Sequence, residues 1–383
     1  MGYHRLSVIP SAVRDHTLLL VPRQSFLPGN VGSLQNLKKE LGMSHILEVR
    51  GLQVAFAGER GNTIGTDRID FFVDQGETVC LVGESGCGKS ITSLAVMGLL
   101  GRGGRVSQGE ILFNGRNLLK MDRKELDQVR GKELSMIFQD PLSSLNPVLT
   151  IGKQLEEGLK AHTELGKEER RKRALDLLGR AGIREAEAVM KKYPHQLSGG
   201  MRQRVMIAMA LSCQPSLLIA DEPTTALDVT IQAQIMNLLR SLKRELRMSL
   251  LLITHDMGLV AQMADRVMVM YAGQIIEEGT VFEIFDHPSH PYTKALLAAV
   301  PSMEQNPEEM LQAIEGTVPE NYGQMTGCRF RDRCPYRKQG CEAPRGNTEG
   351  TGASPGAVLA GKGGRAKWQN LIRIQSPCLR WSI

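Results

Sequence analysis

The sequence has few aromatic residues and no long apolar run. Phe, Trp and Tyr together make up only 4% of the 383 residues, and only two residues are Trp. A helix that crosses a membrane needs about 18 or more consecutive apolar residues. The longest candidate, "MGLVAQMADRVMVMYAG", carries Asp265 and Arg266 in its middle. We therefore expect a chain of about two to three globular domains, judged by its length, with no membrane-spanning helix.

A secretion signal and a strong charge excess are also missing. The apolar stretch "HTLLLVP" near the N-terminus is too short for a signal peptide and has no small-residue cleavage site. The formal net charge is only +6, and basic residues are mixed with acidic ones, as in "GKEERRKRALDLLGR". This mixture favours a solvated helix face over a nucleic-acid track. We expect a cytoplasmic protein that does not bind nucleic acid.

Cysteines are scarce in most of the chain but crowd its end. Three are scattered through the first two thirds, namely Cys80, Cys87 and Cys213. The other four are Cys328, Cys334, Cys341 and Cys378. In a reducing compartment disulfides are not expected, so the second group requires another explanation.

The stretch "GESGCGKS" has the spacing of a loop that binds nucleotide phosphates. An apolar, β-branched run precedes it and "ITSLAVMGLL" follows it, which gives the strand, loop and helix that such a loop requires. Backbone N–H groups and the helix N-terminus would then face the phosphates, Lys89 would reach the β- and γ-phosphates, and Ser90 would bind Mg²⁺. An ordinary glycine-rich turn is the alternative. The predicted nucleotide-binding residues here are Gly83, Glu84, Ser85, Gly86, Cys87, Gly88, Lys89, Ser90 and Ile91.

A second acidic element supports the phosphate-binding interpretation. The run "SLLIADEP" reads as an apolar strand that ends in Asp221 and is followed by Glu222. Asp221 is placed to hold Mg²⁺ through its hydration shell, and Glu222 could polarise an attacking water. Acid pairs after a strand also occur as helix N-caps, so this pair gains weight from its combination with residues 83–90.

The stretch "LSGGMRQR" decides the type of nucleotide enzyme. It places Ser198, Gly199 and Gly200 at the start of the apolar helix "VMIAMALS". The backbone N–H groups at a helix N-terminus have no partner within the helix, so they are suited to bind a γ-phosphate. Here the chain resembles the ATP-binding-cassette (ABC) ATPases, whose signature sequence it matches in full. In that family two cassettes pack head to tail. The resemblance therefore implies that the signature of one subunit covers ATP held by Lys89 of the other, and that hydrolysis reopens the pair.

The same resemblance assigns further residues of the site. Gln139 in "MIFQDP" matches the glutamine that senses Mg²⁺ and the γ-phosphate, His255 in "ITHD" matches the γ-phosphate histidine, and Asp228 in "ALD" matches the loop that communicates across the dimer. Glu222 would be the general base. Phe56 occupies the position of the family's adenine-stacking aromatic, although a Phe at a strand end is more often part of a core.

These motifs imply an α/β fold with three regions. Residues 1–43 lack periodicity, and we expect a poorly ordered extension. Residues 44–285 would form an ABC-type ATPase domain: a RecA-like parallel core, an antiparallel β subdomain and a helical insert at about 148–200. Residues 286–383 are rich in Pro, Gly and Cys, and we expect a small irregular C-terminal regulatory domain.

Other stretches resemble the ATPase subunits of bacterial oligopeptide and dipeptide importers. They are "FQDPLSSLNPVLTIG", "HPSHPYTKALLAAVPS", "IEGTVP" and "GCRFRDRCPYRKQGC". The resemblance implies a peripheral protein on the cytoplasmic face of the inner membrane. Its partners would be a second ATPase subunit, identical or paralogous, two transmembrane permease subunits and, indirectly, an extracytoplasmic solute-binding protein. Importers of nickel, glutathione or other small solutes share the pattern, and a non-transport cassette acting on nucleic acid or ribosomes is a further alternative.

The four C-terminal cysteines match a metal-binding set in that family. Cys328, Cys334, Cys341 and Cys378 supply the four thiolates that a [4Fe–4S] cluster requires, and the family resemblance favours this cluster. The gaps between the first three exceed those typical of zinc pairs. Zinc and unligated thiols remain alternatives, and a long Gly-rich tract before Cys378 departs from the family pattern.

Overall fold

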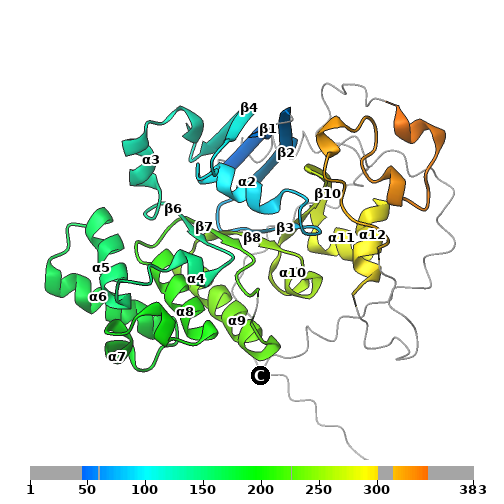
Figure 1. Cartoon of the computed structure of the whole chain (residues 1–383). Helices are drawn as coiled ribbons and strands as arrows, with labels where there is room; N and C mark the ends of the chain where they lie inside the picture. The colour runs from blue at the N-terminus through cyan, green and yellow to red at the C-terminus, as the bar shows by residue number, and fades with distance from the viewer. Residues whose placement is uncertain (1–44, 59–60, 226, 301–313, 344–383) are drawn as a thin grey trace, which may run out of the picture.

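The computed structural model describes residues 45–58, 61–225, 227–300 and 314–343. The expected extension at residues 1–43, Ala226 of the "ALD" motif and Cys378 lie outside this range. Within it, two β-sheets are stacked with a helix between them, and further helices cover the free face of the larger sheet (Figure 1).

The larger sheet is a six-stranded, mostly parallel sheet with the order β10-β9-β3-β8-β7-β6. Only β10 runs antiparallel to its neighbour, and the other pairs are parallel. Its strands are β3 (Thr78–Val82), β6 (Leu134–Ile137), β7 (Leu217–Asp221), β8 (Ser249–Thr254), β9 (Arg266–Tyr271) and β10 (Gln274–Thr280). This sheet confirms the expected α/β fold with a parallel core.

Both faces of the parallel sheet are buried, which explains why its strands are apolar without alternation. In β3, Val79 and Leu81 face one apolar cluster, whereas Cys80 and Val82 face the other. The same alternation holds in β8, where Leu251 faces the first cluster. Successive side chains of a strand point to opposite faces, so one run of residues contributes to two cores.

A four-stranded antiparallel sheet covers the first of these clusters. Its order is β2-β1-β4-β5, and its strands are β1 (His45–Gly58), β2 (Gly61–Asp74), β4 (Gly104–Phe113) and β5 (Arg116–Asn117). Helix α2 (Lys89–Val96) lies between the two sheets (Figure 1), with Ala95 and Val96 buried in the shared core. The short elements η1 (Leu118–Lys120) and α3 (Arg123–Val129) follow the sheet.

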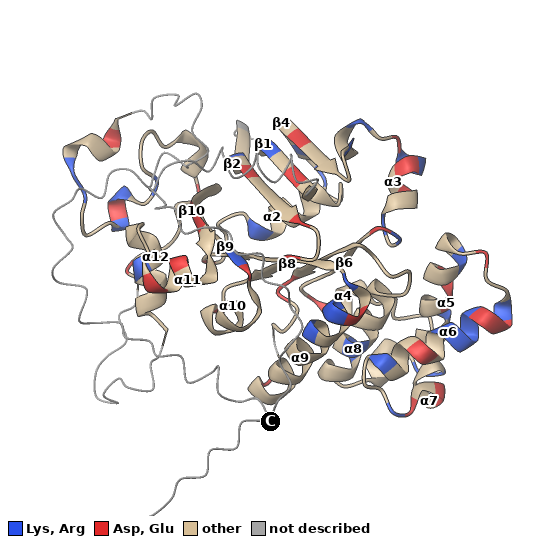
Figure 2. Cartoon of the chain, turned by 180° about the vertical axis from the view of Figure 1, so that it is seen from behind, with Lys and Arg blue, Asp and Glu red and all other residues tan. Residues whose placement is uncertain are grey.

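Helices cover the opposite face of the parallel sheet. Those near the sheet are α4 (Pro141–Ser144), α8 (Gly199–Ala210), α9 (Val229–Leu246), α10 (Met257–Met263), α11 (Val281–Asp286) and α12 (Pro291–Ala298). A second group lies to one side: α5 (Ile151–His162), α6 (Lys167–Arg180), α7 (Ala186–Met190) and η2 (Pro194–Gln196). Acidic and basic side chains are mixed along α6 (Figure 2), as in a solvated helix face. None of the described helices is both long and apolar enough to cross a bilayer.

The described C-terminal residues 314–343 pack beside β10 and α12 (Figure 1). They contain only the short turns η3 (Tyr322–Gln324), η4 (Arg331–Arg333) and η5 (Gln339–Glu342). Tyr322 and Phe330 are buried in the main cluster of the ATPase core. The described part of the expected C-terminal domain therefore has no separate core and is built onto the ATPase fold.

Candidate functional site

The candidate site lies where the parallel strands end. Gly83 follows β3, Glu222 follows β7 and His255 follows β8 directly, while Gln139 comes two residues after β6. Because the carboxyl ends of parallel strands meet at one edge of a sheet, these residues converge although they are far apart in the sequence.

The loop between β3 and α2 is compressed between two backbone segments. A Cβ atom on Gly83 would lie 2.2 Å from the carbonyl oxygen of Met270, and one on Gly88 would lie 2.6 Å from that of Gly65. Gly88 also has φ 110°, a left-handed conformation that L side chains rarely adopt. These contacts explain why glycine is needed at both ends of the loop.

Lys89 is directed back into the loop. Its Nζ donates hydrogen bonds to the carbonyl oxygens of Gly83 and Glu84, at 2.7 and 2.9 Å, and only 5% of the residue is exposed. The loop is thereby folded around a buried ammonium group. This places a positive charge where the sequence predicts a triphosphate.

The predicted metal ligands lie together and suit Mg²⁺. The Ser90 hydroxyl donates to Oδ1 of Asp221 at 3.1 Å, and the Ser93 hydroxyl donates to Oδ2 at 3.3 Å. Burial raises the pKa of Asp221 above its ordinary value, although the hydrogen bonds from the two serines act in the opposite direction. A hydroxyl beside a buried carboxylate is the all-oxygen donor set that Mg²⁺ prefers.

Glu222 is the centre of a hydrogen-bond network at the strand edge. Its Oε2 accepts from Nε2 of Gln139 at 3.1 Å and from the Thr225 hydroxyl at 2.9 Å, and its Oε1 lies 3.3 Å from Nδ1 of His255. Its backbone has φ 44°, an uncommon conformation for a residue with a side chain, and its N–H donates to the Ile253 carbonyl at 2.9 Å. Such strain is typical of functional sites.

The surroundings of Glu222 keep its carboxylate ionised. Burial acts to raise its pKa, but hydrogen bonds from Thr225 and His255, together with the charge of Lys89, outweigh burial and hold the pKa below the ordinary glutamate value. The side chain of His255 is 62% exposed, so this side of the network is open to solvent.

The signature residues lie at the N-terminus of α8, a helix on the face of the parallel sheet opposite α2 (Figure 1). The Ser198 hydroxyl accepts from Met201 N–H at 3.4 Å and caps α8. Gly200 lies against Ile231 of α9, and Asp228 caps α9 by accepting from Ile231 N–H at 2.9 Å. Among the described residues, no hydrogen bond joins the signature turn to the phosphate loop.

Phe56 lies on the wall of a pocket beside the phosphate loop. The pocket has a volume of about 320 Å³, in the range of small-molecule sites. It is lined by Phe56, Thr63, Ile64, Gly65, Ser85, Gly86, Ile91, Thr317, Val318, Pro319, Glu320 and Tyr322. The structure thus brings together the predicted adenine residue, two residues of the loop, and Ile91. The adenine-binding role of Phe56 stays a prediction.

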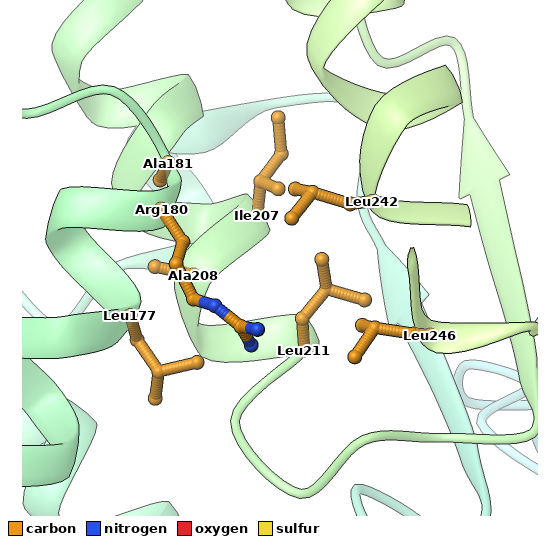
Figure 3. A pocket seen from close by; sticks show the side chains of 8 residues that line it. All are labelled: Leu177, Arg180, Ala181, Ile207, Ala208, Leu211, Leu242 and Leu246. Atoms are coloured by element: carbon orange, nitrogen blue, oxygen red, sulfur yellow. The ribbon is translucent and has the colours of Figure 1, made fainter. Parts of the chain in front are cut away.

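A second cavity, between α6, α8 and α9, is not a ligand site. It encloses about 10 Å³ among apolar side chains and Arg180 (Figure 3), which leaves room for a single water at most. The Arg180 guanidinium pairs with Glu245.

Cys87 faces inward. The side chain is completely buried, and burial raises the pKa of its thiol. The Cys87 side chain therefore fills space inside the loop and is not an exposed, reactive thiol.

The predicted [4Fe–4S] cluster finds no support in the described residues. Cys328, Cys334 and Cys341 lie in one irregular segment, and the Cys328 N–H donates to the Cys341 carbonyl at 2.8 Å. Nevertheless, within the described ranges no group of three or more His, Cys, Asp or Glu side chains could hold a metal ion. The three thiols are free cysteines there, and the fourth predicted ligand, Cys378, lies outside those ranges.

Several residues that complete the site were not predicted from the sequence. Thr225 and Ser93 are hydroxyl donors beside predicted residues, so their spacing could have suggested them. Tyr292 and Arg333 come from the C-terminal part of the chain: the Tyr292 hydroxyl accepts from Glu84 N–H at 2.9 Å, and Arg333 pairs with the Glu84 carboxylate. Arg333 stands within "GCRFRDRCPYRKQGC", where the cysteines were the more conspicuous signal.

Comparisons with known families match two parts of the chain. The pattern described as ABC transporter matches residues 66–225. The pattern described as Oligopeptide/dipeptide transporter, C-terminal region, matches residues 276–341. The first covers the phosphate loop, the signature and the Asp221–Glu222 pair, and the second covers Tyr292 and Arg333.

Individual proteins are similar over most of the chain. The oligopeptide transport ATP-binding protein AppD of Bacillus subtilis is 51% identical over 300 residues, which cover 78% of this chain and 91% of AppD. The dipeptide transport ATP-binding protein DppD of Escherichia coli is 51% identical over 298 residues, with 78% and 91% covered. A solved dimeric ATP-binding cassette, MJ0796 bound to ADP and phosphate, superposes with a TM-score of 0.56 at 29% identity and covers 61% of this chain and 98% of that one.

Proposed function

The chain belongs to the ABC transporter family of ATPases, and from this premise we propose that it energises the import of peptides through a membrane transporter. The C-terminal pattern and the relatives named for oligopeptide and dipeptide transport favour peptides over nickel, glutathione or another small solute. The solute is selected by other subunits.

The observation that carries the ATPase role is the network around Glu222. A glutamate held by Gln139, Thr225 and His255, next to Asp221 and Lys89, is arranged to act on a γ-phosphate. When bound, Mg²⁺ would neutralise charge on the phosphates, and Ser90, Asp221 and Gln139 would hold it.

The residues of the chain define the hydrolysis step. Glu222 accepts a proton from a water whose oxygen attacks the γ-phosphorus. The bond between the γ-phosphorus and the β,γ-bridging oxygen breaks, and the products are ADP and phosphate. Lys89 stabilises charge on the phosphate oxygens, and His255 orients Glu222 and the γ-phosphate.

Two chains are needed to complete the site. Ser198, Gly199 and Gly200 lie on the opposite side of the sheet from their own phosphate loop, so in this proposal they cover the ATP of a second ATPase subunit, identical or paralogous. The solved cassette MJ0796, which this chain resembles, is dimeric, and this supports a site that needs two subunits. Asp228 lies beside the signature turn and communicates across the dimer.

Two permease subunits complete the transporter on the cytoplasmic face of the membrane. After Gln139 the chain exposes Leu142 and Val148, which are 57% and 75% exposed, and these apolar side chains suit contact with a permease. A solute-binding protein would deliver peptide from outside. ATP hydrolysis as proposed needs no [4Fe–4S] cluster.

The variant Glu222→Gln tests this proposal. We expect ATP to bind with unchanged affinity while the hydrolysis rate falls about 100- to 1,000-fold, as on loss of a general base. Glu157→Gln, an exposed change on α5, is the matched control. Calorimetry measures binding and phosphate release measures turnover. Substantial hydrolysis by Glu222→Gln would contradict the role of Glu222.

Transport is tested in cells that lack this chain. Wild-type protein should restore uptake of labelled dipeptides and oligopeptides, and Glu222→Gln should not. Restored uptake of nickel or glutathione without peptides would replace the proposed solute.

A further inference from the structure

The C-terminal segment 314–343 is bonded to the strands and the loop that form the nucleotide pocket. The Tyr322 hydroxyl donates to the Gly65 carbonyl at 2.8 Å. Arg329 donates to the Ala272 carbonyl at 2.6 Å and pairs with Asp67 at 2.5 Å. Tyr322, Phe330 and Arg329 are all buried, so these contacts belong to the interior of the molecule.

Arg333 joins this segment to the phosphate loop. Its Nη1 and Nη2 donate to the two carboxylate oxygens of Glu84 at 2.6 and 2.9 Å, and only 7% of its side chain is exposed. Such a bidentate pair fixes geometry as well as charge. Glu84 is the second residue of the loop, one residue after Gly83, whose carbonyl accepts from Lys89.

The same guanidinium holds the stretch that leads into the pocket wall. Its Nε donates to the Glu315 carbonyl at 2.7 Å, and Nη2 also reaches the Gly316 carbonyl at 3.2 Å. All three nitrogens of the Arg333 guanidinium therefore have acceptors, and a lysine could not reproduce this planar pattern. One side chain therefore ties the phosphate loop to residues 314–316.

The next residues, Thr317–Glu320, line the same pocket as residues of the antiparallel sheet. Phe56 and Ile64 contribute from that sheet, and Ser85 and Gly86 contribute from the loop. The pocket of about 320 Å³ is thus enclosed on one side by the C-terminal segment, and it opens onto the phosphate loop. Its apolar and aromatic lining next to a phosphate site suits a nucleoside.

We propose that the C-terminal segment is a functional part of the nucleotide site: Thr317–Glu320 form a wall for the nucleoside, and Arg333 is the positioning residue that holds this wall against the phosphate loop through Glu84. This inference rests on the proposed ATPase function and adds to it. It gives the C-terminal segment a role in ATP affinity that does not depend on its cysteines.

Removing Arg333 should weaken ATP binding without disabling chemistry. In full-length Arg333→Ala we expect the Kd and the KM for ATP to rise about tenfold, because a buried charge pair that orders the loop is lost, while kcat stays within about threefold. Arg333→Lys should recover only part of the affinity. Arg337→Ala is the matched control, since Arg337 lies in the same segment and pairs with Glu342, away from the loop.

The reciprocal variant separates positioning from loss of folding. Glu84→Gln should raise the Kd for ATP by a similar factor, and the double variant should be no worse than Arg333→Ala alone, because both changes break one contact. Thermal unfolding of each variant shows whether the native state persists. Additive losses in the double variant would show that the contact does not act as one unit.

The wall is tested by filling the pocket. Val318→Trp should raise the Kd for ATP about tenfold or more and leave binding of inorganic tripolyphosphate unchanged, because tripolyphosphate needs only the phosphate end. Val300→Trp, two residues after α12 and outside the pocket lining, should change neither. Equal losses of affinity for ATP and tripolyphosphate would contradict the proposal that Thr317–Glu320 contact the nucleoside.

Failure of this inference differs from failure of the proposed function. If wild-type protein neither binds nor hydrolyses ATP, the proposed function fails. If wild-type protein does both, and Arg333→Ala and Val318→Trp bind ATP as tightly as their controls, only the role of the C-terminal segment is refuted.

Discussion

The two ends of the nucleotide pocket are built in different ways. The phosphate end comes from contiguous residues 83–90 and from residues that directly follow parallel strands, such as Glu222 and His255. The base end combines Phe56 of β1, Ile64 of β2 and Thr317–Glu320 of the C-terminal segment. The first is set by local backbone geometry at a sheet edge, whereas the second requires segments more than 250 residues apart in the sequence to pack together.

The two ends of the pocket also differ in what they recognise: the phosphate end recognises charge, and the base end recognises shape. Phosphates are bound by backbone amides, one lysine and oxygen ligands, all of which follow from short motifs. A base is bound largely through apolar contact, and the contact surface is whatever the tertiary structure presents. Variants at the two ends should therefore affect ATP and tripolyphosphate differently.

The largest effect should come from the phosphate end. Lys89→Ala removes the buried ammonium that donates to Gly83 and Glu84. We expect the Kd for ATP to rise about 100-fold, equivalent to about 2.7 kcal/mol, with a similar loss for tripolyphosphate. Titration calorimetry checks this, with the exposed Lys120→Ala as control. Selective loss of ATP alone would contradict the assignment of Lys89 to the phosphates.

A smaller and selective effect is expected at the base end. The Phe56 ring packs near Gly65 and Gly104 beside the pocket. Phe56→Ala should raise the Kd for ATP about fivefold to tenfold by removing a stacking surface, and it should leave tripolyphosphate unaffected. Phe56→Tyr keeps the ring and should bind as the wild type does. If Phe56→Ala weakens the binding of ATP and of tripolyphosphate equally, Phe56 acts by packing in the core and not by contact with the base.

A shift in pH dependence should follow from the hydrogen bonds to Glu222. Thr225→Val has nearly the same shape but removes a donor that lowers the pKa of Glu222. The ionised carboxylate is the active form of Glu222. Because loss of the Thr225 donor raises the pKa of Glu222, acidification protonates the carboxylate and abolishes activity at a higher pH than in the wild type. We expect the acid limb of the kcat profile to move to higher pH. No shift, or a downward shift, would contradict the assigned base.

The smallest effect concerns Cys87. Burial of the side chain and the raised pKa of its thiol predict that iodoacetamide near neutral pH leaves Cys87 unmodified in the native protein, with or without ATP. The partly exposed Cys213 serves as internal control, and both should react after unfolding. Peptide mapping by mass spectrometry measures this. Rapid labelling that ATP prevents would show that the loop opens.

Much of the fold could be predicted because the motifs lie in apolar strands. The run "TVCLV" is buried on both faces as β3, and "LLIAD" is buried in the same way as β7. Apolar runs without alternation predict central parallel strands, and these carry Gly83 and Glu222 to one edge. The contact between Gln139 and Glu222 follows from that topology, although no spacing in the sequence reveals it.

The predicted cysteine cluster finds no such support in the residues that the structure describes. Four thiols suggested a metal site, but the three that the structure describes provide none. The side chain of this stretch that contacts the phosphate-loop residues is an arginine, Arg333, whose partner Glu84 lies 249 residues earlier. An ion pair between distant residues leaves no periodicity in a sequence.

By itself, the sequence determined that this chain belongs with the ABC ATPases and predicted its phosphate loop, its Mg²⁺ aspartate, its catalytic glutamate and its signature, because each depends on a short strand-to-helix geometry. Only the tertiary structure decided that Arg333 pairs with Glu84 and that Thr317–Glu320 line one pocket with Phe56, Ser85 and Gly86. The physical reason is that apolar burial and a single guanidinium bring together segments whose separation along the chain carries no local signal.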